Sequence, residues 1–441
     1  MQTFLVLALL HTTPITLEEV RQVARNNLEA LKAELALASS HQNVRQAWAP
    51  VYPQLSTELS ANRTWAGPQR YYQAVPMGMS GDFDNIPIDV KGSTYTRLGF
   101  QLQLQQLVYD GGRWWKQIAQ AGFLREAAEG ELAEQRLVSE TEGARRFFEL
   151  LKAQIALEVL ENARQRSAEQ LERAKALFEA GRTQKLDVIN AEIHLGSDTI
   201  RLVMQRQAIV QAQANLLQWL SRPYADIRAE HPLPPEGLND KLVLNAEDIL
   251  SLAQNRRPLF RALSKRMRAA AYAISIASAN HWPSIFLSLQ YQRSGTELSP
   301  FVSDWRRQNA LAGMFNLRWM LFDGFSTSSN KALAALEQAG ARRDLQQAEI
   351  QLSGEVRQAL AQLEVQREVL KLARRNRQKS EEGLVLSSER FVAGQGSSLE
   401  MREAQLRLVE TELTEQQNRV DVEMAWISLE RVVGGSLEEL Q

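Results

Sequence analysis

The sequence predicts a mainly α-helical chain that also carries a membrane β-barrel, arranged as two tandem repeats of helix, strand, strand, long helix and helix. Three observations predict this fold: two long stretches without proline, motifs that recur at a fixed spacing, and four segments of alternating hydrophobicity. Proline is absent from 88–222 and from 301–441 of the 441 residues. Because proline breaks helix interiors, each of these stretches can hold a very long helix.

Two motifs recur at a spacing of 213 residues. The aromatic-Asp-Gly triplet at 109–111 returns at 322–324, and the turn motif Phe-x-Ala-Gly at 178–181 returns at 391–394. Chance matches would not keep this register, so we expect the same unit twice. The expected segments are a signal peptide at 1–14, a first repeat at 15–221, a linker at 222–244 and a second repeat at 245–441. The signal peptide lacks a basic start and a cleavage motif, so an ordinary buried segment is the alternative.

Helical periodicity follows each aromatic-Asp-Gly motif. Apolar residues recur every three or four positions, as at 345–363, which is the pattern of an amphipathic helix. A helix over 112–178 would reach on the order of 100 Å, longer than any single globular core. A glycine turn should end each long helix, and return helices should follow at 186–220 and 399–433. A dimeric coiled-coil rod would also explain the helices.

Four segments alternate between apolar and polar residues and therefore predict strands. They lie at 51–65, 98–105, 285–292 and 311–321, and about ten residues suffice to cross a bilayer when a strand is tilted. Four strands cannot close a barrel, and open edges in lipid leave backbone groups unsatisfied. Three chains would supply twelve strands, so a trimer is expected. A soluble four-stranded sheet that covers a core is the alternative.

Composition excludes several classes of protein. The 51 Lys and Arg residues nearly balance the 52 Asp and Glu residues, and there is no cysteine. Nucleic-acid binding is not expected without a basic excess, and disulfides and zinc-thiolate sites are excluded. The five histidines are far apart, and no nucleophile and base are marked out by spacing. We therefore expect neither an enzyme nor a bound metal or cofactor.

The motifs together resemble the outer membrane efflux protein family, the TolC-like channels of Gram-negative bacteria. The resemblance rests on the opening at 17–27, on Pro53 and Pro283 at the strand starts, and on the two repeated motifs. It implies a homotrimer whose 12-strand β-barrel, set in outer-membrane lipid, joins an α-helical barrel that crosses the periplasm. It also implies a passive exit duct in a tripartite efflux or type I secretion system, with a periplasmic adaptor and an inner-membrane pump. A coiled-coil scaffold of the cell envelope is the alternative, and the cargo stays open.

The same resemblance implies that the two turns line the periplasmic entrance. The candidate tip and adaptor-contact residues are Gly181, Leu186, Gly394 and Leu399. The candidate selectivity residues are the acids Glu400, Glu403 and Asp187, which three-fold symmetry would turn into rings. The candidate gate links between protomers are Arg182, Lys185 and Arg390. In the alternative interpretation Glu400 is a first-turn helix acid, Glu403 is a solvated acid, and the three basic residues are ordinary surface charge.

Overall fold

The computed structural model describes residues 13–77, 82–231, 245–303, 308–393 and 395–435. The signal-peptide prediction falls largely on residues 1–12, which lie outside these ranges, and the division into repeats and linker stays a prediction. The chain forms two compact units. The first comprises Met1–Ser40, Leu124–Met267 and Gly340–Gln441, and the second comprises His41–Phe123 and Arg268–Ala339.

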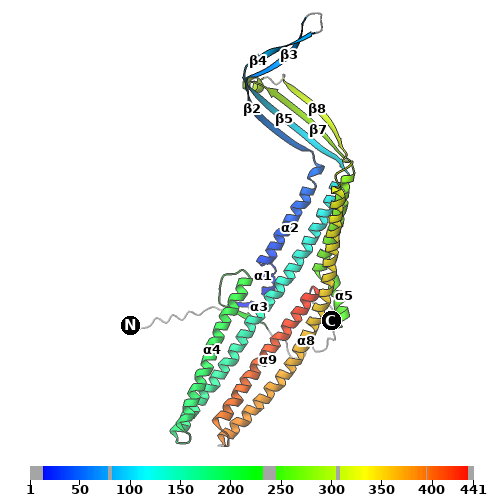
Figure 1. Ribbon diagram of the computed structural model, residues 1–441. Helices are drawn as coiled ribbons and strands as arrows, with labels where there is room; N and C mark the ends of the chain where they lie inside the picture. Colours follow the sequence, from blue (N-terminus) through cyan, green and yellow to red (C-terminus); the bar gives the residue numbers. More distant parts are fainter. Residues whose placement is uncertain (1–12, 78–81, 232–244, 304–307, 394, 436–441) are drawn as a thin grey trace, which may run out of the picture. The chain divides into compact units, whose positions relative to one another are not determined.

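The second unit holds a four-stranded antiparallel sheet (Figure 1). Its strands are β2 (Gln54–Ala66), β5 (Ser93–Asp110), β7 (Ser284–Gly295) and β8 (Asn309–Arg318), in the order β2-β5-β7-β8. The four alternating segments thus form four strands of one sheet, as predicted, although the last strand ends at Arg318 rather than at Leu321. Strands β2 and β8 are the edges of this sheet, and each has a strand partner on one side only.

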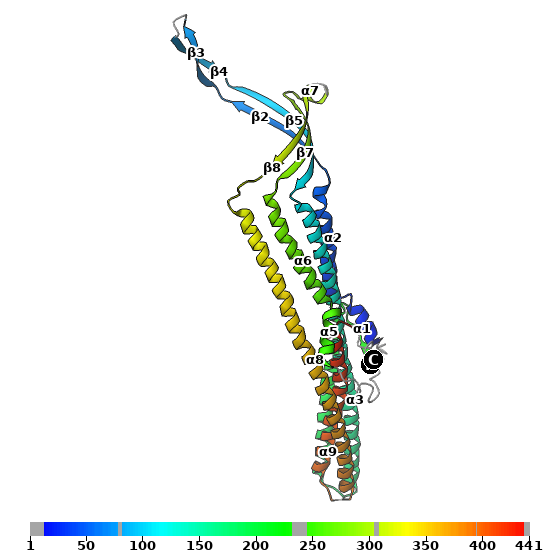
Figure 2. The ribbon, with the colours of Figure 1, turned by 90° about the vertical axis from the view of Figure 1, so that its right-hand side faces the viewer.

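A second hairpin lies between the first two predicted strands, in a segment for which no strand was predicted. Strands β3 (Gln69–Met77) and β4 (Asp82–Val90) pair with each other and not with the main sheet (Figure 2). A cross-strand ion pair supports them, with Arg70 Nη2 2.8 Å from Asp89 Oδ2. In the other half of the chain, the connection between β7 and β8 holds the short helix α7 (Leu298–Ser303).

A long helix follows the last strand of the main sheet in each half of the chain, after two residues in the first half and seven in the second. Helices α3 (Arg113–Glu179) and α8 (Ser326–Val392) have 67 residues each. The return helices α4 (Lys185–Trp219) and α9 (Ser398–Val433) have 35 and 36 residues. The bounds of α3, α4 and α9 lie within one residue of those predicted, because glycine turns and uninterrupted apolar periodicity are strong signals.

The aromatic-Asp-Gly motif is a strand-to-helix junction. Asp110 Oδ2 accepts a hydrogen bond from the Trp114 amide at 3.1 Å, and Asp323 Oδ2 accepts one from the Thr327 amide at 2.7 Å. Each aspartate therefore satisfies a free N–H group at the start of a long helix. The following residue turns the chain with a positive φ, +73° at Gly111 and +65° at Gly324, a conformation that glycine adopts without strain.

Shorter broken helices precede each strand pair. Helices α1 (Leu17–Ala24) and α2 (Leu28–Ala47) open the first half, and α5 (Ala246–Arg256) and α6 (Pro258–Ser278) open the second. The side chains of Thr16 and Asn245 cap α1 and α5, since they accept hydrogen bonds from the Glu19 and Glu247 amides. Single 3₁₀ turns, η1 (Ala49–Val51) and η3 (Ala279–His281), connect these helices to the strands.

A small parallel ladder was not predicted. Strand β1 (Thr13–Thr16) pairs with β6 (Ile227–Glu230), so regular structure extends into the range expected to be a linker. Ile15, Ile227 and Ala229 are buried there against Phe147 and Phe148 of α3 and form the largest core cluster of the helical unit. None of the helices in the described ranges is both long and apolar enough to cross a membrane.

Candidate functional site

The turn between α3 and α4 is closed by backbone hydrogen bonds around Gly181. The Arg182 amide donates to the Leu177 carbonyl at 2.8 Å, and the Gly181 amide donates to the Phe178 carbonyl at 2.9 Å. Gly181 has a φ of +69°, and a Cβ added to it would meet no atom within 4 Å. The glycine is therefore needed for its backbone conformation and not for space.

The turn between α8 and α9 is closed differently. Gly394 lies outside the described residues, and the Gln395 and Gly396 amides both donate to the Arg390 carbonyl, at 2.8 and 3.0 Å. Ser397 then caps α9 by accepting a hydrogen bond from the Glu400 amide at 3.1 Å. Ser397 and Glu400 stand at the positions of a capping box.

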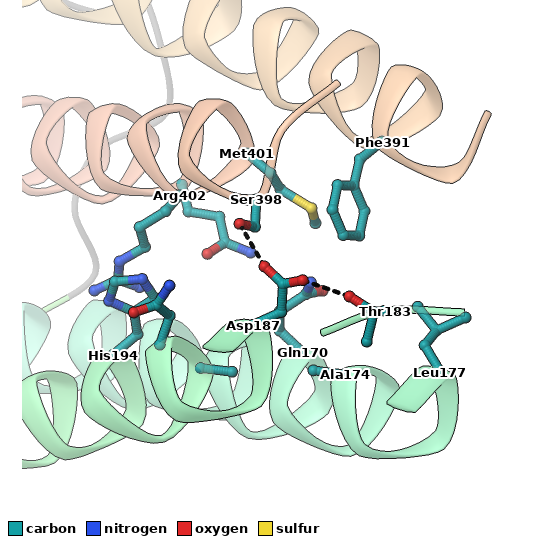
Figure 3. Close-up of a pocket in the computed structure, with 13 residues that line it drawn as sticks. Gln170, Ala174, Leu177, Thr183, Asp187, His194, Phe391, Ser398, Met401 and Arg402 are labelled. Carbon is teal, nitrogen blue, oxygen red and sulfur yellow. Dashed lines mark hydrogen bonds between the residues drawn. The ribbon is translucent and has the colours of Figure 1, made fainter. Parts of the chain in front are cut away.

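Asp187 joins the two turns. The Ser398 hydroxyl at the start of α9 donates to Asp187 Oδ1 at 3.1 Å, and the Thr183 hydroxyl also donates to this carboxylate (Figure 3). These hydrogen bonds, the one from Thr183 first, hold the pKa of Asp187 below its usual value. The carboxylate lines a cleft that His194 and Arg402 also line. Asp187 therefore links the two helical hairpins of one chain.

Glu400 and Glu403 line one groove between α8 and α9, together with the basic residues Lys379 and Arg407. Arg390 Nη1 lies 2.7 Å from Glu400 Oε1, and Arg407 lies 4.0 Å from Glu403 in the same helix. The structure thus brings a predicted gate residue and a predicted selectivity residue together within one chain. Such exposed pairs contribute little stability. The gate role of Arg390 and the selectivity role of Glu400 both stay predictions.

The other candidates at the tips are exposed. Arg182 and Lys185 lie on the surface of the first turn, and Leu186 and Leu399 expose 59% and 65% of their surface. Apolar side chains this exposed are available for contact with another chain. Their predicted roles as gate links and adaptor contacts rest on the resemblance.

Sequence reasoning missed a buried polar cluster behind the turns. Arg402 of α9 donates to both carboxylate oxygens of Asp198 of α4, at 2.9 Å each, and to the Ser167 hydroxyl of α3 at 3.1 Å. Burial raises the pKa of Asp198, but the hydrogen bonds from Arg402 and Ser167 outweigh it and lower the pKa overall. One signal was present: Asp198 stands between Leu195 and Leu202, where helical periodicity expects an apolar residue.

The sequence is similar to those of known proteins. The outer membrane efflux protein family matches residues 20–222 and 249–435. Protein CyaE of Bordetella pertussis is 27% identical over 356 residues, an alignment that covers 77% of this chain and 65% of CyaE. The chain thus spans just under two thirds of that curated relative.

Solved structures share the fold at low sequence identity. The outer membrane protein VceC of Vibrio cholerae has a TM-score of 0.74 at 19% identity, covering 96% of this chain and 97% of VceC. The open state of the MtrE outer membrane channel of Neisseria gonorrhoeae has a TM-score of 0.76 at 18% identity, covering 96% and 89%.

These matches are to efflux proteins and channels rather than to enzymes, and they do not favour the scaffold alternative. The family model covers both halves of the chain, including both long helices and both turns. The chain belongs to the outer membrane efflux protein family, so it is a protein of the Gram-negative outer membrane, as the sequence resemblance implied.

Proposed function

We propose that three copies of this chain form a channel that serves as a passive exit duct across the outer membrane and the periplasm. The observation that carries this proposal is the four-stranded sheet with edges at β2 and β8. In lipid, an unpaired strand edge leaves N–H and C=O groups without partners, which costs several kcal/mol for each group. Pairing β8 of one copy with β2 of the next would close a 12-strand barrel without a free edge.

The surface of the strands agrees with this arrangement. Leu55 and Leu59 on β2 and Leu311, Phe315 and Leu317 on β8 are all more than half exposed in the single chain. On β2 they alternate with the polar residues Ser56, Glu58 and Ser60, whereas on β8 the polar residues of the other face are Asn316 and Arg318, at the end of the strand. An apolar face outward and a polar face inward is the pattern of a barrel with a water-filled lumen.

The helix turns would then form the periplasmic entrance of the α-helical barrel. Three-fold symmetry would repeat Glu400 and Glu403 around it as six carboxylates, three of them paired with Arg390. Asp187 would contribute less, because its carboxylate already accepts two hydroxyl hydrogen bonds. Carboxylates that converge in this way attract cations and repel anions.

The exposed tips suit docking to a periplasmic adaptor that connects the duct to an inner-membrane pump. Leu186 and Leu399 provide apolar contact, and Arg182 and Lys185 provide charge beside it. Because the chain has no cysteine, Leu399→Cys carries a single thiol for cross-linking in cells. We expect a cross-link to an adaptor at Leu399→Cys. We expect none at a partly exposed position far from the turns, such as Glu29→Cys.

Conductance tests the channel directly. Purified wild-type protein should migrate as a trimer before heating and should open ion channels in planar bilayers that added Mg²⁺ blocks. Glu400→Gln with Glu403→Gln should weaken this block, whereas Glu381→Gln, an exposed acid on α8, should leave it unchanged. Absence of conductance would exclude the channel, and equal Mg²⁺ block in all variants would exclude the acidic entrance.

A further inference from the structure

The buried Arg402–Asp198–Ser167 cluster joins α9 to α3 and α4, the two consecutive helices of the first hairpin. The side chains of Arg402 and Asp198 expose only 9% and 6% of their surface. The planar guanidinium holds both carboxylate oxygens at 2.9 Å, and the Ser167 hydroxyl donates to Asp198 Oδ2 at 2.5 Å. A bidentate pair of this kind constrains orientation as well as distance.

This cluster interrupts an apolar seam. Leu160, Ala163 and Leu202 pack on one side of it with Val409 of α9, and Leu171, Ala174 and Ala191 form a second apolar cluster on the other side. A buried ion pair is seldom more stable than an apolar pair of the same volume. What a bidentate ion pair adds is a fixed orientation, because a small rotation of a helix breaks its two hydrogen bonds, whereas apolar side chains tolerate such a rotation.

The geometry of α9 connects this cluster to the acids. Successive residues of an α-helix are about 100° apart around its axis, so Arg402 lies roughly 160° from Glu400 and about 100° from Glu403. Arg402 and Ser398 bind the α3–α4 hairpin, whereas Glu400 and Glu403 line the groove toward α8. Rotation of the first two turns of α9 would move the acids out of this groove and break the ion pair at the same time.

We propose that Arg402 is a positioning residue for the acidic entrance: by binding Asp198 and Ser167, it fixes the rotation of α9 that directs Glu400 and Glu403 into the α8 groove. The inference rests on the proposed channel function. In it, the ion selectivity of the channel depends on Arg402, although this residue does not contact the permeating ion. It requires the paired geometry of Arg402 and not only its bulk or charge.

Two variants separate geometry from packing. Asp198→Leu with Arg402→Met replaces the pair by apolar side chains, and Arg402→Lys keeps the charge but loses the planar fork. Mg²⁺ block should weaken several-fold in both, while the apolar pair should leave the heat stability of the trimer nearly unchanged. A merely structural role predicts the reverse, with altered heat stability and wild-type block, and that result would overturn the proposal.

A second readout does not depend on conductance. Gly383 of α8 and Ala404 of α9 line the same groove, so Gly383→Cys with Ala404→Cys can be joined by a short thiol cross-linker in this cysteine-free chain. Cross-linking should be efficient with Arg402 present and should fall several-fold in Arg402→Lys, even if the apolar pair does not fold. Equal cross-linking yields would refute the positioning role, whereas a wild-type protein without conductance would refute the channel alone.

Discussion

Helices α3 and α8 have the same length and equivalent places in the two halves of the chain, yet their surfaces differ. Lys152 and Arg173 of α3 correspond, at the spacing of 213 residues, to Val365 and Leu386 of α8. Lys152 is paired with Asp421, whereas Val365 and Leu386 are 56% and 60% exposed. Equivalent positions are thus charged in the first half of the chain and apolar and exposed in the second half.

This difference shows that the two halves do not have the same neighbours. Phe147, Phe148 and Leu150 of α3 are fully buried within the chain, so these apolar side chains of α3 are already covered by other parts of the same chain. Exposed valine and leucine side chains in a row favour contact with another chain. We infer that α8 is covered by a neighbouring copy in the proposed trimer.

The largest expected effect comes from giving α8 the residues of α3. Val365→Lys with Leu386→Arg should abolish the heat-stable trimer, because the charges would be buried without partners at the contact between copies. Helix content measured by circular dichroism should stay the same, since neither side chain is buried within the chain. Lys371→Ala, at an exposed polar position of the same helix, is the control. A trimer that survives the double substitution would contradict the inferred contact.

The two halves also differ at the break between their short helices, α1 and α2 in the first half and α5 and α6 in the second. In the first half, buried Asn27 accepts hydrogen bonds from the Ala30 amide at 3.0 Å and from the Ser139 hydroxyl at 3.1 Å. In the second half, buried Arg257 binds Glu134 at 3.0 Å and Glu355 at 2.6 Å. An amide therefore holds one break and a charged triad holds the other.

Arg257→Ala should lower the free energy of unfolding by about 3 kcal/mol or more, because it removes the ion-pair partner of Glu134, whose side chain is only 13% exposed. Asn27→Ala should cost about 1–2 kcal/mol, the usual effect of losing a helix cap. Thermal or denaturant unfolding in detergent would measure both. Similar losses for the two variants would show that Glu134 is hydrated after the arginine is removed.

The sequence predicted the regular elements better than the contacts between them. Apolar periodicity and the glycine turns located both long helices, because these signals are local. The β3–β4 hairpin was missed, since Pro76 and Pro87 argue against strands. The pairs Arg402–Asp198 and Arg390–Glu400 were also missed, because one-dimensional spacing does not say which charged residues meet across a helix bundle.

A smaller effect should distinguish two glycines of the first hairpin. Gly181→Ala should destabilise the protein by about 1 kcal/mol, because alanine disfavours the positive φ at this turn. Gly196→Ala, in the middle of α4 with open space around it, should stabilise it by about 0.5–1 kcal/mol through helix propensity. Melting temperatures of the two variants should therefore shift in opposite directions. A shift in the same direction would indicate that Gly196 is covered by another chain.

The smallest expected effect concerns the link between the turns. Because the pKa of Asp187 is lowered in the folded protein, its charge stabilises the fold above the ordinary aspartate pKa of about 3.9, and this contribution is lost as the pH falls through the lowered value. Asp187→Asn keeps the side-chain shape but removes the charge. The difference in melting temperature between wild type and Asp187→Asn should be constant from pH 7 to pH 5 and should vanish only in stronger acid. A difference that already shrinks between pH 7 and pH 5 would mean that another group, such as His194 in the same cleft, controls the link.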